Sequence, residues 1–175
     1  MLLRLLALTS LLQALRGDDA SDEPGVLALV EQHLRDGVDP NSSSEWDSWG
    51  RGPLYNAAHK GFVQVGVVLV AAGADLDATD SAGVTPLIQA AYRGRVAMVE
   101  LLLLSGARTE PADKDGRALD SARLMQETDE SGAIVQMLLA VGQWQSKGGT
   151  VLGKEGLMEA MAAYTTEEEE EGSTE

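Results

Sequence analysis

Apolar residues recur at intervals of three and four along most of this chain, which is the spacing of one buried face of an α-helix. The segment 96–106 shows the pattern clearly, with Val99, Leu102 and Leu103 forming an apolar stripe. Gly106 follows the stripe and suits the left-handed conformation that ends many helices. We therefore expect a short helix that ends at this glycine.

Another helix is predicted directly upstream. Thr85 can cap it with its hydroxyl group, and Pro86 suits the first helical position because no backbone N–H bond is needed there. Leu87, Ala90 and Ala91 then share one face, and the small alanines let a neighbouring helix approach closely. The pattern predicts a unit of helix, turn, helix and extended connection.

This unit is repeated with a period of 33 residues. The segment 47–62, DSWGRGPLYNAAHKGF, aligns without a gap on 80–95, DSAGVTPLIQAAYRGR, and Leu69 falls on Leu102 at the same offset. A 33-residue period with a T-P-L start is typical of ankyrin repeats, which the segment 83–107 resembles. The resemblance implies an all-α solenoid of stacked helix-turn-helix units with extended, β-hairpin-like fingers, whose function is to bind another protein.

Divergent units flank the two clear repeats. Downstream, Leu119 and Ala122 take the places of Leu87 and Ala90, and the stripe returns at 134–142 after a turn lengthened by QETDESG. In the ankyrin family a histidine follows the conserved leucine, and its hydrogen bonds link adjacent turns. The three later units have other residues at this position, so those hydrogen bonds lack their usual donor: Tyr55, Ile88 and Asp120. We expect a stack of modest stability.

A leading unit is predicted in two pieces. The segment 26–41 resembles a second helix and its exit, with His33 on the flank of that helix, and 11–18 resembles the first helix and turn. The predicted domains are a repeat stack over 1–143 (a capping repeat 1–41, repeats 47–79 and 80–112, and a degenerate terminal repeat 113–143), a linker and C-terminal helix at 144–165, and a disordered acidic tail at 166–175. The C-terminal helix either covers the open end of the stack or is a nascent helix in a mobile tail.

Two interpretations of the N-terminus stay open. The Leu-rich segment 1–17 supplies a first capping helix, or it is a targeting peptide of a secreted or organellar ankyrin protein. No small-x-small cleavage site follows, and the segment is too short and polar to span a bilayer. The chain has no cysteine, which excludes disulfides and thiolate chemistry and favours the cytosol or nucleus.

The formal net charge is −15, and it remains −9 when the six glutamates within 167–175 are set aside. An acidic body repels phosphate backbones, so we expect no nucleic acid and no membrane as partner. The charge favours a partner protein with a basic segment, and we expect the chain itself to be a monomer.

No pattern of residues predicts catalysis, a metal or a cofactor. The segment 148–155 satisfies G-x-x-x-x-G-K, but Glu155 stands where a phosphate-binding loop needs Ser or Thr, so a nucleotide-binding enzyme is a remote alternative. The two histidines have no partner at metal-ligand spacing. We therefore predict that the protein is not an enzyme.

The strongest candidate for partner binding is the first finger. It is three residues longer than its equivalents, and it carries Trp46 and Trp49 among serines and an aspartate. Each ring either anchors a partner or folds back over the helix near Tyr55. The resemblance adds the non-core positions of the first helices, where ankyrin grooves make contacts: Asn56, His59, Gln89, Tyr92 and Arg93.

Overall fold

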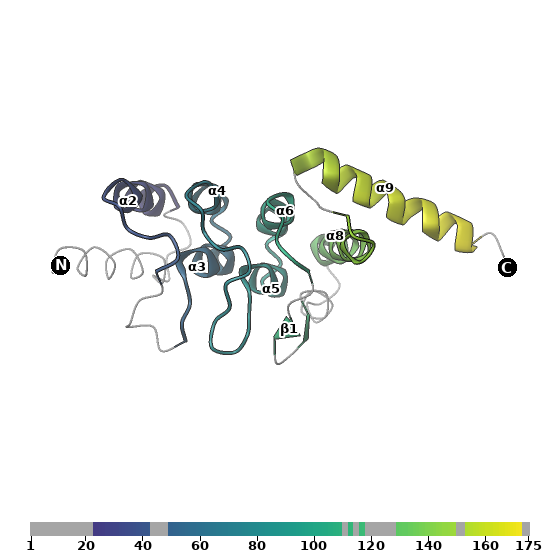
Figure 1. Ribbon diagram of the computed structural model, residues 1–175, viewed down its shortest axis with the longest axis horizontal. Coiled ribbons are helices and arrows are strands. Elements are labelled where there is room, and N and C mark those ends of the chain that lie inside the picture. Colours follow the sequence, from purple (N-terminus) through teal and green to yellow (C-terminus); the bar gives the residue numbers. More distant parts are fainter. Residues whose placement is uncertain are drawn as a thin grey trace.

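The computed structural model describes residues 23–42, 49–109, 112–113, 116–117, 129–149 and 153–172. Within these ranges the helices lie in two layers (Figure 1). One layer holds the second helices of successive units, and the other holds the first helices, from which the connections project as fingers. The second helices are α2 (Glu23–Arg35), α4 (Val63–Ala71) and α6 (Val96–Leu104), and the first helices are α3 (Pro53–Lys60) and α5 (Pro86–Tyr92).

Local signals start and end the first helices where the sequence predicts. Thr85 caps α5, because its hydroxyl oxygen accepts a hydrogen bond from the backbone N–H of Ile88 at 3.2 Å, and a proline opens each of the two helices. Gly61 ends α3 with φ of 80°, a conformation that residues with a side chain rarely adopt. Each unit is thus delimited by its own residues.

Packing between neighbouring units makes the core. First helix α3 packs on α5, and second helix α4 packs on both α2 and α6. Gly66 permits the close approach of α4 and α6, because a Cβ atom there would lie 2.9 Å from Cδ2 of Leu101. Leu69 and Leu102, the pair related by the repeat period, are both completely buried. The apolar stripes therefore join into one continuous core, as the sequence predicts.

The C-terminal end is more ordered than the sequence predicts. Helix α8 (Asp129–Ser146) begins inside the QETDESG segment, so that segment does not form a lengthened turn throughout. Helix α9 (Gly153–Gly172) is helical beyond residue 166, where we expected a disordered tail. Glutamate is a good helix former, and a helix already nucleated by packed upstream turns extends at little cost.

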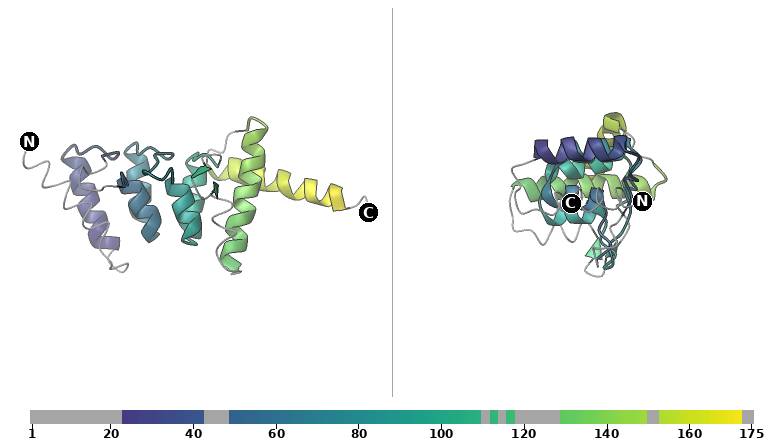
Figure 2. Two further views of the ribbon diagram at one scale, coloured as in Figure 1. Left: turned by 90° about the horizontal axis from the view of Figure 1, so that it is seen from below. Right: turned by 90° about the vertical axis from the view of Figure 1, so that its left-hand side faces the viewer.

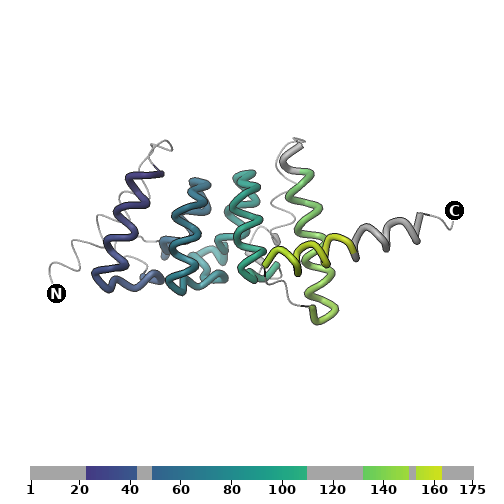
Figure 3. The backbone as a smooth tube through the Cα atoms, turned by 90° about the horizontal axis from the view of Figure 1, so that it is seen from above, coloured from purple at the N-terminus to yellow at the C-terminus, as the bar shows by residue number. Residues whose placement is uncertain are grey.

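Helix α9 lies across the end of the stack against α8 and α6 (Figures 2 and 3). In Figure 2 its C-terminal half projects away from the stack. Leu157 and Ala160 on its N-terminal half belong to the same apolar core as the repeats. The expected boundary between stack and linker at 143 falls inside α8. Two two-residue strands, β1 (Ala112–Asp113) and β2 (Gly116–Arg117), pair antiparallel in the finger before the last unit.

At the other end of the stack, His33 is buried, not on the flank of α2 as expected. Its Nδ1 donates a hydrogen bond to the carbonyl oxygen of Leu29 at 2.6 Å, which gives this buried nitrogen a partner. The segment 1–17, with both of its interpretations, lies outside the described residues, as does the first helix expected around Leu119. None of the described helices combines the length and apolarity needed to cross a membrane.

Candidate protein-binding surface

A hydrogen-bonded relay of three side chains joins the two first helices. The hydroxyl of Tyr55 donates to Oε1 of Gln89 at 3.1 Å, and Nε2 of Gln89 donates to Nδ1 of His59 at 2.7 Å. Tyr55 and His59 stand on α3, one helical turn apart, whereas Gln89 comes from α5 in the next unit. The relay therefore supplies a link between units although the family's histidine is absent from its usual position.

The relay fixes the protonation of His59. Since Gln89 donates to Nδ1, that nitrogen carries no proton and the ring is neutral with its hydrogen on Nε2. The pKa of His59 is lowered from 6.5 to about 4, first by burial and then by the positive charges of Arg93, Lys60, Arg51 and Arg95. A neutral imidazole is the form that this site stabilises.

Asn56 and Gln89 are not at the surface, and the expectation that they occupy non-core positions is wrong. They are 6% and 7% exposed. The amide nitrogen of Asn56 donates to the carbonyl oxygen of Gly52 at 3.0 Å. The alanines of α3 and α5 bring the two helices so close that the neighbouring amides are covered, and hydrogen bonds satisfy them. Both residues therefore stabilise the binding surface from inside and are not part of its exposed area.

Tyr92 and Arg93 are at the surface, as the sequence predicts. Tyr92 ends α5 and is 51% exposed, so about half of its side chain faces solvent. The guanidinium carbon of Arg93 lies 5.9 Å from the centre of the Tyr92 ring, within range of a cation–π contact. The pair presents an apolar face and a positive charge side by side.

Trp49 is 55% exposed, so its ring does not fold back into the core. Its carbonyl oxygen accepts a hydrogen bond from the backbone N–H of Ser81 at 2.8 Å, which ties the end of the first finger to the second. Trp46 lies outside the described residues. The structure thus leaves the ring of one of the two candidate tryptophans accessible, while a hydrogen bond anchors its backbone.

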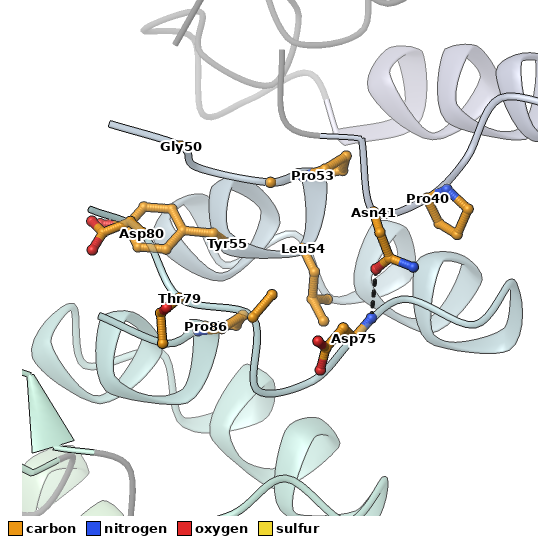
Figure 4. Close-up of a pocket in the computed structure, with 12 residues that line it drawn as sticks. Pro40, Asn41, Gly50, Pro53, Leu54, Tyr55, Asp75, Thr79, Asp80 and Pro86 are labelled. Atoms are coloured by element: carbon orange, nitrogen blue, oxygen red, sulfur yellow. Dashed lines mark hydrogen bonds between the residues drawn. The ribbon is translucent and has the colours of Figure 1, made fainter. Parts of the chain in front are cut away.

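A cleft of about 140 Å³ separates these two fingers (Figure 4). On one side, Oδ1 of Asn41 accepts a hydrogen bond from the backbone N–H of Asp75 at 2.7 Å. Its lining combines apolar side chains with polar groups of the fingers. The apolar ones include Pro40, Pro53, Leu54, Tyr55 and Pro86, and the polar ones include Thr79 and Asp80. The cleft is smaller than the about 300 Å³ of usual small-molecule pockets, and its size suits one side chain of a partner.

Comparison with known sequences agrees with this architecture. A family model described as ankyrin repeats (3 copies) matches residues 19–115, more than half of the chain. The chain belongs to the ankyrin repeat family. This membership confirms the resemblance and the all-α solenoid that the sequence predicts. No curated protein matches the chain.

Proteins built from ankyrin repeats are generally protein–protein interaction modules and typically have no catalytic activity. Among the described residues, no three His, Asp or Glu side chains are grouped so as to hold a metal ion. In the glycine-rich segment at 148, the element before the loop is helix α8, whereas a phosphate-binding loop needs a strand. Close packing explains the glycine at position 149, because the indole of Trp144 lies where a Cβ atom would be.

Sequence reasoning missed the basic residues that surround His59. Arg51, Lys60 and Arg95 were not candidates, because each is unremarkable within its own segment and the chain as a whole is acidic. Their common action on one imidazole appears when α3 and α5 are packed together. A signal was present in the repeat alignment, since Lys60 falls on Arg93 at the offset of 33.

Proposed function

We propose that this ankyrin repeat protein is an adaptor or scaffold that binds a partner protein through its first-helix layer and fingers. The observation that carries the proposal is the exposure of Tyr92 on a helix whose inward face is fully buried. A half-exposed ring on a rigid helix loses little conformational entropy on binding and buries a large area, as interface anchors do. Trp49 on the first finger and the cleft lined by Gly50 are two further candidate contacts, at the finger end of the same layer.

The finger carboxylates have structural roles that reduce the case for a basic partner segment. Oδ1 of Asp77 accepts from the backbone N–H of Arg108 at 3.0 Å. In the same way Oδ1 of Asp80 accepts from Ala82 and Val84, which shapes the turn before α5. These acids stabilise the fingers whatever the partner is, so the net charge of the chain does not by itself select a basic segment.

Site-specific photo-crosslinking tests the proposal. A photoreactive phenylalanine analogue at position 92 should crosslink the partner in a cell extract, and the same analogue at position 67 should not. Val67 is the matched control, because it is also exposed but lies on second helix α4, in the other layer. Equal crosslinking at both positions, or none at position 92, would contradict the assignment of the binding face.

Trp49→Ala then separates an anchor from a structural residue. We expect the affinity for the crosslinked partner to weaken by about 2 kcal/mol, roughly thirtyfold, with an unchanged melting temperature. If melting falls while affinity per folded molecule is unchanged, the ring has a structural role and is not an anchor.

The proposal takes the protein to act as a monomer in the cytosol or nucleus. Sedimentation equilibrium of the full chain tests the monomer. Intact mass of the protein recovered from its own cells tests the location, because loss of about the first 17 residues would favour the targeting-peptide alternative.

A further inference from the structure

The first helices and the turns that follow them differ in charge from the rest of the chain. The segments 51–64 and 85–99 contain four cationic residues and no Asp or Glu, in a protein whose net charge is −15. The four are Arg51, Lys60, Arg93 and Arg95, here named the cationic turn surface. They come from two adjacent units, so the fold and not the local sequence collects them.

Contacts fix where two of these charges lie. The side chain of Arg95 runs over Gly61, since a Cβ atom at Gly61 would stand 2.8 Å from Cδ of Arg95. Arg95 therefore reaches back from the start of α6 to the end of α3, beside Lys60. Arg93 is held next to the ring of Tyr92. All four positive charges act on His59, whose pKa they lower.

Helix stability explains part of this cluster. Lys60 and Arg93 stand at helix C-termini, where a positive charge interacts favourably with the helix dipole. Arg95 occupies the N-cap of α6, and Arg51 lies directly before the N-cap of α3. A positive charge at a helix N-terminus is unfavourable, because it faces the positive end of the helix dipole. The side chain of Arg95 nevertheless reaches the C-terminal end of α3, where its charge is favourable, and the side chains of Arg93 and Arg95 both remain exposed to a ligand.

We propose that the cationic turn surface binds an acidic segment of a partner protein, with Tyr92 as the adjoining apolar anchor. The inference rests on the proposed function and names the chemistry of the partner. Carboxylates of the segment would pair with the guanidinium groups of Arg93 and Arg95, which offer paired donors that suit a carboxylate.

The charge of the whole chain favours an acidic peptide segment over a nucleic acid. An extended polyanion such as a nucleic acid would reach beyond the cationic turn surface and meet the acidic remainder of the protein. A short acidic segment would stay within about 8 Å of the four positive charges, which is one screening length at physiological salt. One nearby carboxylate is already engaged: Oε1 of Glu23 accepts from the backbone N–H of Gln64 at 2.8 Å. The chain's own glutamate run belongs to α9, which projects from the C-terminal end of the stack (Figures 1 and 2).

A phage-displayed library of short random peptides, selected on the immobilised full chain, tests the inference. We expect the enriched peptides to be rich in Asp and Glu next to an apolar residue. A synthetic copy should bind the double variant Arg93→Glu/Arg95→Glu at least about tenfold more weakly, and its affinity should fall between about 50 and about 500 mM NaCl. The control Lys147→Glu/Lys154→Glu makes the same charge change on exposed lysines at the C-terminal end, and should bind normally.

The outcomes separate the two proposals. Enriched peptides that depend on Tyr92 but carry no acidic excess would overturn the inference and leave the proposed function standing. No enrichment at all would count against both. Tighter, Arg93-dependent binding of oligothymidylate, or of a peptide copying residues 165–175, would replace the acidic partner by nucleic acid or by a second copy of this chain. Circular dichroism melting of each variant shows that the stack is intact.

Discussion

The hydroxyl of Tyr55 donates a hydrogen bond to Oε1 of Gln89, 34 positions along the chain, across the boundary between two repeats. Both groups are buried, and Gln89 passes the connection on to His59. A buried polar relay of this kind is stabilising when every member is satisfied and costly when one is removed. The same contact that links the repeats therefore makes their interface sensitive to single substitutions.

Replacing Gln89 should destabilise the stack. Gln89→Leu leaves the hydroxyl of Tyr55 and Nδ1 of His59 without this partner, and should lower the free energy of unfolding by about 1 to 3 kcal/mol. Urea unfolding measures the loss. Adding Tyr55→Phe should cost less in the Gln89→Leu background than alone, because the hydrogen bond from the hydroxyl to Gln89 is already absent there. Strict additivity of the two substitutions would contradict the relay.

Acidification should weaken the fold through His59. Its pKa is about 4 in the folded protein and 6.5 when unfolded, so between these values the unfolded chain binds the extra proton. The contribution of the neutral ring is complete above about pH 6.5 and is lost as the pH falls toward 4. Melting temperatures of the parent and of His59→Gln should therefore converge as the pH falls through this window. A constant difference from pH 7.5 to pH 4 would show that the ring does not titrate as described.

Leu102 should be among the most sensitive core positions. It is completely buried between units, so Leu102→Ala should lower the free energy of unfolding by about 2 to 5 kcal/mol through lost burial and a cavity. Val67→Ala, on the exposed side of α4, is the control and should change it by less than about 0.5 kcal/mol. Similar values for the two variants in urea would disprove the assigned core face.

Helix α9 should stabilise the stack through its N-terminal half. Leu157, 9% exposed, packs in the core, whereas its neighbour Met158 is 71% exposed. Leu157→Ala should cost about 2 kcal/mol or more, and Met158→Ala almost nothing. Removing residues 165–175 should leave the melting temperature unchanged. Equal effects of the two alanine variants would mean that α9 does not dock in solution.

The repeat period, the first-helix caps and the core stripes could all be predicted from the sequence. Thr85, Pro86 and Gly61 act through bonds and backbone angles within a few residues of themselves, and Leu102 follows from helical spacing alone. Such signals are local, so a one-dimensional pattern contains them. That is why the family, the fold class and the general function could be predicted from the sequence.

Only the tertiary structure decided which polar residues of the first helices reach the surface. Asn56 and Tyr92 both satisfy the pattern of a non-core position, yet one is buried and the other exposed. The difference depends on the neighbouring unit. Close packing through the alanines covers Asn56, whereas Tyr92 at the end of α5 is left exposed. The gathering of Arg51, Lys60, Arg93 and Arg95 around His59 likewise needs two units in contact. Burial and electric field are set by distances in space, and residues 33 positions apart become neighbours only when the repeats stack.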